Sequence, residues 1–257
     1  MLLALLAVAA LADWVPVRWA SSDPASLDLL RGTRFNCVLL EPSQWDPGFL
    51  AAARERGIAA AGVLSRADGA VEQAARAREL KLDALVFEGA PPVATVLPVI
   101  ELLSRRELER APAGGVTGTW QGVWPGINPR EEDNAALAGP TSAPWLDTNS
   151  GVLRYLRSRT RARLWIANRP PGGRAYPVVR YLQAMADAAL AGARWVVALD
   201  EDFTRRMAAK EARALKEWRE ICSFGDFLER RDAWRGWPSY GLLGLAQDPA
   251  QGAFVSG

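Results

Sequence analysis

Three carboxylates end short apolar runs of the sequence, and their type and position suit acid–base chemistry. Glu41 ends the run FNCVLLE, Glu88 ends DALVFE and Asp200 ends WVVALD. Two carboxyl groups across a sugar can hydrolyse a glycosidic bond, at about 5–5.5 Å for retention and about 6.5–9.5 Å for inversion. We predict Glu88 as the general acid and Asp200 as the nucleophile or base, with Glu41 in reserve. The alternative for each acid is structural, because such carboxylates often cap the next helix.

A second set of residues suits a surface that grips a flat polar ring. The stretch from 114 to 151 contains GGVTGTWQGVWPGINP and keeps no lasting helical or strand periodicity. A long loop inside a domain is functional or disordered, and disordered segments are poor in aromatic residues. The alternative is that the tryptophans fill a small core of the loop itself. We predict that sugar rings stack on Trp120, Trp124 and Trp145. The sugar hydroxyl groups are expected to form hydrogen bonds with polar side chains, namely Gln121, Asn168, Arg169 and Asp202.

Composition excludes several classes of site. The chain has no histidine, which removes Ser-His-Asp and Cys-His catalysis and histidine-bound metals. Its two cysteines, Cys37 and Cys222, do not form a metal-binding spacing. A run of three acids, Asp200 to Asp202, leaves calcium as an alternative. We predict no metal and no cofactor. The formal net charge of +2, spread along the chain, predicts no nucleic-acid partner.

The apolar runs are the elements that must position these side chains. Near-continuous apolar strands that alternate with helices indicate a parallel sheet buried on both faces. Eight such units in 257 residues predict an α/β fold, a (β/α)8 TIM barrel, with its site at the carboxyl ends of the strands. An open doubly wound sheet is the alternative, weakened because no G-x-G-x-x-G follows the first strand. The expected strands are Trp14–Trp19, Phe35–Glu41, Ile58–Ser65, Asp83–Glu88, Val96–Leu103, Gly115–Trp120, Arg163–Asn168 and Trp195–Asp200.

Helices are expected between most of these strands. Asp23 and Pro24 suit the start of a first helix, and Gly57 and Gly192 suit the ends of two others. The expected helices are Pro24–Leu30, Pro47–Arg56, Ala67–Leu80, Arg105–Arg110, Gly151–Arg161, Pro177–Leu190 and Met207–Phe227.

The two ends of the chain differ from this barrel of residues 13–237. Residues 1–12, MLLALLAVAALA, end in an A-x-A pattern and predict a signal peptide, hence a secreted or periplasmic protein; an N-terminal helix is the alternative. This apolar run is too short to span a membrane. The tail, residues 238–257, predicts a ninth strand in Tyr240–Gly257. That strand begins a downstream domain absent from this chain or packs across the barrel end.

Four motifs carry a resemblance to a known group of proteins. GTWQGVWPGI, AGPTSAPWLDTNSG, WIANRPP and GARWVVALDEDF resemble secreted bacterial TIM-barrel proteins that are glycosidase-like in outline and have no assigned activity. The resemblance implies a barrel, secretion and further domains. The best-known barrel glycosidases carry a catalytic Glu after the fourth strand and another after the seventh. Glu88 matches the first, but the seventh strand here ends in Ala-Asn-Arg without a carboxylate.

Two functions follow from these residues. The first is a secreted, glycoside-hydrolase-like barrel that hydrolyses or binds a poly- or oligosaccharide. The second is a non-catalytic carbohydrate-binding or scaffold domain that has lost a catalytic acid. A carboxylate pair in a tryptophan-lined pocket favours the first. Acids paired with Arg105 or Arg169 favour the second.

Overall fold

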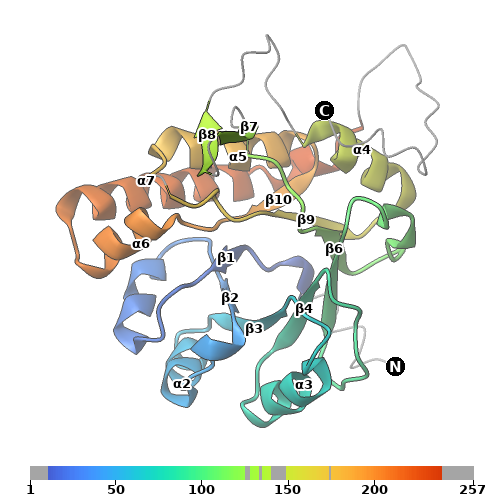
Figure 1. The fold of residues 1–257 in the computed structure, drawn as a ribbon, viewed down its shortest axis with the longest axis horizontal. Helices are drawn as coiled ribbons and strands as arrows, with labels where there is room; N and C mark the ends of the chain where they lie inside the picture. Colours follow the sequence, from blue (N-terminus) through green and yellow to red (C-terminus); the bar gives the residue numbers. More distant parts are fainter. Residues whose placement is uncertain (1–10, 125–127, 133–134, 140–148, 174, 239–257) are drawn as a thin grey trace.

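Eight parallel strands form a nearly closed barrel in the computed structural model, which describes residues 11–124, 128–132, 135–139, 149–173 and 175–238 (Figure 1). Each strand pairs with the next in chain order, and Arg18 N–H donates to the carbonyl of Val197 at 2.8 Å, which links the last strand to the first. The predicted α/β barrel is confirmed. The strands are β1 (Pro16–Arg18), β2 (Cys37–Leu40), β3 (Ala59–Leu64), β4 (Ala84–Glu88), β5 (Val99–Leu103), β6 (Val116–Thr119), β9 (Arg163–Ala167) and β10 (Ala193–Val196).

The apolar strands form because both of their faces are buried. Side chains alternate between the barrel interior and the helices outside. Trp165 is fully buried in the interior, and β6 approaches it so closely that a Cβ on Gly118 would lie 1.7 Å from the Trp165 carbonyl oxygen. Only glycine fits at that position. The interior cluster also includes Cys37, Leu39, Ala61, Val63, Ala84, Val86, Ile100, Leu102, Val116, Ala167 and Val196.

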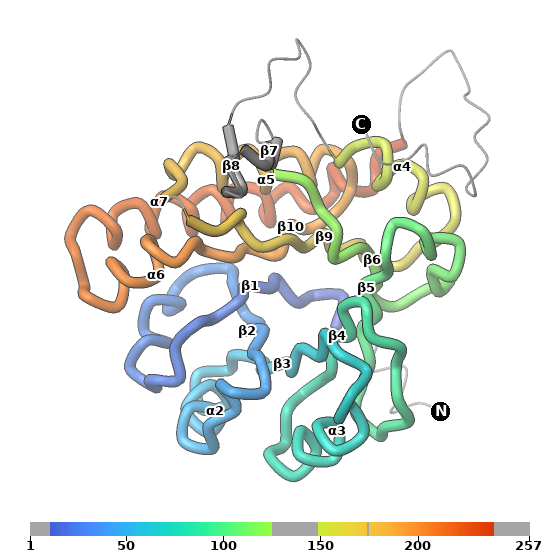
Figure 2. Tube along the Cα trace, in the orientation of Figure 1, coloured from blue at the N-terminus to red at the C-terminus, as the bar shows by residue number. Residues whose placement is uncertain are grey.

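Helices surround the ring of strands, as the trace in Figure 2 shows. The connection between β4 and β5, residues 89–98, holds no helix. The α-helices are α2 (Pro47–Glu55), α3 (Ala70–Glu79), α4 (Ser150–Arg159), α5 (Val178–Leu190), α6 (Glu201–Ala208) and α7 (Ala212–Glu229). Short 3-10 helices are η1 (Pro24–Leu30), η2 (Pro42–Gln44), η3 (Leu108–Arg110) and η4 (Asp232–Gly236).

Two expectations about local structure were wrong. The long helix expected over Met207–Phe227 is two helices, because the chain turns at Lys210 with φ of 56°. The first of them starts early because the Asp200 carboxylate accepts from Phe203 N–H at 2.8 Å and caps it. Within the stretch expected to be irregular, β7 (Asn128–Glu132) and β8 (Ala135–Gly139) pair as an antiparallel hairpin.

The described chain begins with residues that belong to the barrel. Leu11 is buried within the interior cluster, and Arg194 at the start of β10 donates to the carbonyls of Ala12 and Trp14. Cleavage after Ala12 would remove Leu11 from this cluster. The signal peptide stays a prediction, because residues 1–10 lie outside the described part of the chain. The strand expected in Tyr240–Gly257 also lies outside it and stays a prediction. In the described residues, no helix is both long and apolar enough to span a bilayer.

Replacing Leu11 by alanine tests whether the leading segment supports the barrel. We expect Leu11→Ala to lower the free energy of unfolding by about 2 kcal/mol, because the substitution removes buried methyl groups and leaves a cavity in the interior cluster. Leu190→Ala is the matched control, since Leu190 is 80% exposed and its loss should change stability by less than about 0.5 kcal/mol. Urea denaturation of both variants gives the two values. Equal small effects would show that Leu11 does not support the fold.

Candidate functional site

An ion-pair network spans the mouth of the barrel. The Arg18 guanidinium contacts both carboxylate oxygens of Glu88 through Nη2, and its Nη1 lies 3.4 Å from Glu41 Oε1. Arg169 Nη2 donates to the same Glu41 oxygen. Glu88 and Arg18 are nearly buried, at 9% and 12% side-chain exposure, whereas Arg169 is 62% exposed. Two guanidinium groups therefore converge on one carboxylate of the barrel mouth.

Strand alternation explains why Arg18 and Glu88 meet. Ala84 and Val86 of β4 belong to the interior cluster, so Glu88, two residues further on, points the same way. In β1, Val17 packs in the outer cluster and Arg18 therefore points inward. Both side chains come from the carboxyl ends of their strands and fill the top of the interior. Arg18 is not among the residues predicted from the sequence, although its position at the end of the first strand was a usable signal.

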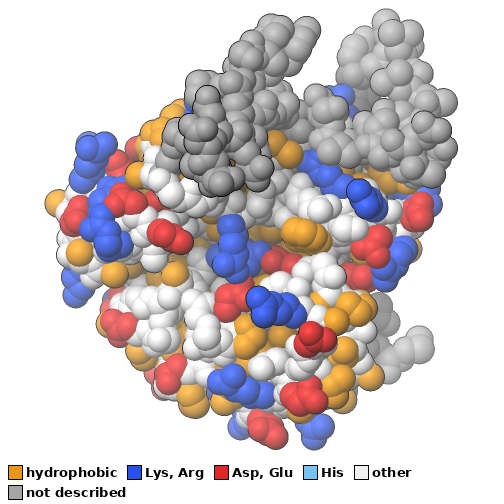
Figure 3. Space-filling view, in the orientation of Figure 1, with side chains coloured by type: hydrophobic (Ala, Val, Ile, Leu, Met, Phe, Trp, Pro, Cys, Tyr) orange, Lys and Arg blue, Asp and Glu red, His pale blue; other side chains and the backbone are white. Residues whose placement is uncertain are grey.

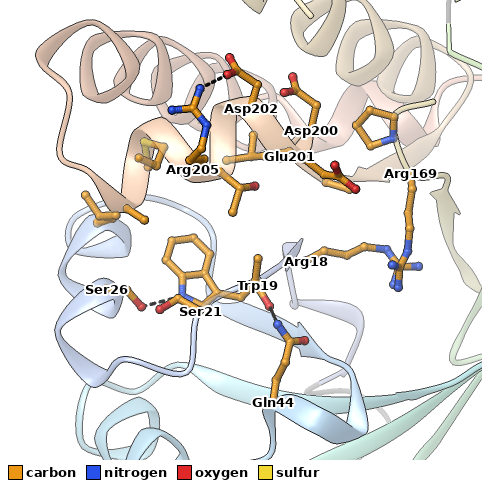
Figure 4. A pocket seen from close by; sticks show the side chains of 18 of the residues that line it. Arg18, Trp19, Ser21, Ser26, Gln44, Arg169, Asp200, Glu201, Asp202 and Arg205 are labelled. Atoms are coloured by element: carbon orange, nitrogen blue, oxygen red, sulfur yellow. Dashed lines mark hydrogen bonds and ion pairs between the residues drawn. The ribbon is translucent and has the colours of Figure 1, made fainter. Parts of the chain in front are cut away.

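A cleft of about 1550 Å³ opens beside this network. The loops that follow β1, β2 and β9, together with the start of α6, form its walls (Figure 4). On the face in Figure 3, basic and acidic side chains gather side by side near the middle. The polar and charged lining includes Arg18, Ser21, Asp23, Ser26, Ser43, Gln44, Glu41, Arg169, Asp200, Glu201, Asp202, Thr204, Arg205 and Lys210.

Hydrogen bonds fix the wall that carries Glu41. The Trp19 indole donates to Ser26 Oγ at 2.9 Å, and Gln44 Nε2 donates to the Trp19 carbonyl at 2.8 Å (Figure 4). Gln44 Oε1 in turn accepts from Glu41 N–H at 2.7 Å. Because Gln44 ties the loop after β2 to the loop after β1, the Glu41 backbone is held at the edge of the cleft.

The contacts of Asp200 give it a structural role at the start of α6. Its carboxylate accepts from the Tyr181 hydroxyl at 2.6 Å, from Tyr176 N–H at 3.1 Å and from Phe203 N–H at 2.8 Å. Burial, together with the bond to Asp200, raises the pKa of the Tyr181 hydroxyl, which keeps it a donor. The pair of Glu88 with Asp200 stays a prediction. The contacts place Glu88, Glu41 and Arg18 together instead, and they engage Asp200 in capping α6.

Two of the tryptophans expected to stack on sugar, Trp120 and Trp124, do not line this cleft. Trp124 is 2% exposed, with its ring stacked on Tyr176 at 5.8 Å and edge-on to Trp195 at 5.4 Å. Trp124 is therefore a core residue, but of the main outer cluster of the barrel and not of a small core within the loop itself. The Trp120 indole lies against Gly89, half-buried beside the end of β4. Trp145 lies outside the described residues.

The predicted polar ligand-binding residues divide between the cleft and the loops. Arg169 and Asp202 line the cleft, and Asp202 pairs with Arg205 and Arg206 of its own helix. Gln121 Oε1 instead accepts from the Arg105 backbone N–H at 2.6 Å. In the same way, Asn168 is used inside the fold, since its Nδ2 donates to the carbonyl of Gly122.

A buried polar cluster that sequence reasoning missed holds the base of the long loop. Asn149 is fully buried, and it accepts from Val123 N–H at 2.7 Å and donates to the Val123 carbonyl at 2.8 Å. Its own N–H donates to Asp187 on α5 at 2.8 Å, and Arg105 Nη2 lies 3.4 Å from its Oδ1. Asn149 therefore links the two ends of the long loop, at Val123 and at Asn149 itself, and joins them to Asp187 on α5. Val123 and Asp187 are both far from Asn149 in the sequence.

Within the described residues, no group of three or more Cys, Asp or Glu side chains could hold a metal ion. Both cysteines are free and buried, and burial raises the pKa of each thiol, that of Cys222 to about 12. Neither thiol has the exposed, electropositive surroundings of a reactive cysteine.

Comparison with known proteins finds no family and only distant structural likenesses. No family model and no curated protein matches the chain. Among solved structures, a flavocytochrome b2 variant with sulfite bound has a TM-score of 0.47 at 11% identity, covering 88% of this chain and 66% of its own. The tryptophan synthase α-subunit of Pyrococcus furiosus has a TM-score of 0.49 at 10% identity, covering 84% and 98%. The OMP decarboxylase of Leishmania donovani has a TM-score of 0.44 at 12% identity, covering 91% and 99%.

These distant likenesses concern the barrel alone. The three proteins are a flavocytochrome, a synthase subunit and a decarboxylase, and none is a glycosidase. The chain spans 66% of the flavocytochrome's length. The barrel is shown by the strand order of this chain itself, and secretion and carbohydrate chemistry stay proposals.

Removing one member of the buried ion pair should destabilise the barrel. We expect Glu88→Gln to lower the free energy of unfolding by about 3 kcal/mol, because it leaves the nearly buried Arg18 without its main partner. Glu41→Gln is the matched control. Its closer partner Arg169 is largely exposed and its second partner Arg18 keeps Glu88, so we expect a loss below about 1 kcal/mol. Denaturant unfolding at neutral pH measures both, and similar losses would contradict the assignment of Glu88 as the main partner.

Asp187 should make stability depend on pH. Burial raises the pKa of its carboxyl above the ordinary value of 3.8, so the folded state binds this proton at higher pH than the unfolded state. Its ionisation therefore costs stability as pH rises from about 4 through the raised pKa. We expect the free energy of unfolding of Asp187→Asn, relative to the native chain, to increase over that window. Denaturation at several pH values measures it, and a constant difference would contradict the shift.

Proposed function

We propose that this chain is a carbohydrate-binding barrel protein that holds an oligosaccharide in the cleft at the carboxyl ends of its strands. One observation carries the proposal. The cleft is large and open, and charged and hydroxyl side chains, including the Arg18 and Glu41 ion pair, lie along its wall beside apolar surface. Barrel enzymes and binding proteins place their sites at this end of the strands.

The chemistry of the lining matches a ligand rich in hydroxyl groups. A sugar hydroxyl both donates and accepts, so it can bridge a guanidinium and a carboxylate that already face each other. Glu41 and Arg169 offer such a pair at the cleft wall, and Ser21, Ser43 and Gln44 add neutral partners. The acids of the network are already paired with arginines. That pairing favours binding over catalysis.

Hydrolysis by Glu41 and Glu88 is the second candidate, and one observation favours it. Both carboxylates contact the terminal nitrogens of one guanidinium, so they lie within roughly 9 Å of each other, a separation used by inverting glycosidases. Against it, Glu41 lines the cleft but Glu88 does not, because Arg18 lies between Glu88 and the cleft. Turnover would require Arg18 to move aside.

Calorimetric titration with a panel of neutral and acidic oligosaccharides tests the binding proposal. We expect at least one to bind, and we expect Arg169→Gln to weaken that binding about tenfold, because an exposed guanidinium at the cleft wall is lost. Arg78→Gln is the matched control, an exposed arginine on α3 away from the cleft. Absence of binding across the panel, or equal loss in both variants, would overturn the proposal.

Release of reducing ends from whichever sugar binds separates the two candidates. If the chain hydrolyses it through this pair, Glu41→Gln should reduce the rate by at least about 100-fold while binding persists. Binding without any release would establish the non-catalytic role. Release that is unaffected by Glu41→Gln would exclude this carboxylate pair.

A further inference from the structure

An exposed row of aromatic side chains lies at the far end of α7 and on η4. Arg231 is 3.8 Å from the centre of the Phe227 ring and 5.4 Å from that of Trp234. Trp234 and Trp237 follow with ring centres 6.0 Å apart. Phe227, Trp234 and Trp237 are 36%, 38% and 62% exposed, which is unusual for such large rings in the described part of the chain. We name these four residues the aromatic row.

The row is separate from the cleft. The cleft is lined by the start of α6, whereas the row follows the last turn of α7 and borders the end of α5, where Leu190 is exposed. In a β/α barrel the helices run antiparallel to the strands, so helix ends lie at the opposite end from the cleft. A small apolar hollow of about 140 Å³ between α5 and α7 adjoins Phe227, Arg231 and Trp234.

Unpaired positive charge borders the row. Arg157 of α4 donates to the Trp237 carbonyl at 3.0 Å, which joins the helix to the row. Arg154 lies about one turn back along α4, and Arg161 follows two residues after the last residue of the helix. Among the described residues, no carboxylate lies within 4.0 Å of the charged groups of these three arginines or of Arg231, whereas many other arginines of the chain are ion-paired.

Helix electrostatics explain only part of this arrangement. Basic residues in the last turn of α4 are favoured by the helix dipole, which accounts for Arg157. The dipole does not account for a guanidinium placed between two exposed rings, or for indoles left in solvent beside it. Exposed apolar patches often mark binding sites, and tryptophan and arginine are enriched among the residues that dominate binding energy.

We propose that the aromatic row and the adjoining Arg154, Arg157 and Arg161 bind a chain of acidic sugars. The exposed ring faces would contact the apolar faces of the sugar rings, and the unpaired guanidinium groups would pair with sugar carboxylates. Charge complementarity selects this ligand over a neutral glycan, which would leave the arginines unused. The ligand class follows from the proposed carbohydrate function, but the surface is a second site whose test does not depend on the cleft.

Titration with polygalacturonate, with dextran as the neutral polymer, tests this surface. We expect binding of polygalacturonate only, weakening as salt increases. Trp237→Ala and Arg231→Gln should each weaken it about tenfold. Arg213→Gln is the matched control, since it removes an 85% exposed charge from the other end of α7 and should leave binding unchanged. Unaltered melting of the variants shows that the fold is kept.

Several outcomes would overturn the inference. Equal binding of dextran, or no effect of either row variant, would remove the acidic-sugar surface. Tighter binding of a single-stranded oligonucleotide would assign the surface to nucleic acid. Dimerisation that Trp237→Ala abolishes would assign it to a second copy of the chain. Arg169→Gln distinguishes the two sites, because loss of polygalacturonate binding in that variant alone would place the ligand in the cleft.

Discussion

The ion pair between Arg18 and Glu88 is the constraint on which the mouth of the barrel depends. Two charged side chains point into the top of an otherwise apolar interior, at 12% and 9% exposure. Burying either charge alone would cost several kcal/mol, on the order of the stability of a whole domain. The pair therefore fixes β1 relative to β4. It engages Nη2 of the Arg18 guanidinium and leaves Nη1 to contact Glu41.

The opposite end of the barrel uses a similar solution. Arg194 and Arg235, both 5% exposed, bind Glu229, and Arg163 joins Asp232 at the starts of the last strands. Arg194 also reaches the carbonyls of the leading segment. Charged clusters thus satisfy the strand ends on both sides of the apolar interior. The cluster at the carboxyl ends opens onto the large cleft, which is why the proposed binding role is placed there.

The sequence predicted the strands well and the contacts poorly, for physical reasons. Parallel strands buried on both faces are near-continuous apolar runs, so all eight were found. The ion pair was not, since Arg18 and Glu88 are 70 residues apart and nothing local links them. Asp200 was expected to be catalytic because the sequence placed it at the end of the eighth strand; that strand ends at Val196, and Asp200 caps α6. Trp124 is apolar enough for either a sugar platform or a core, and only packing distinguishes them.

A double-mutant cycle on Arg18 and Glu88 tests the account most directly. The free energies of unfolding of Arg18→Met, Glu88→Gln and the double variant give the coupling between the two side chains. If the pair organises the mouth, the coupling energy should be about 2 kcal/mol or more, and the double variant should be more stable than the sum of the single losses implies. Additive losses, with a coupling near zero, would show that the two charges act independently and that the cleft does not depend on their pairing.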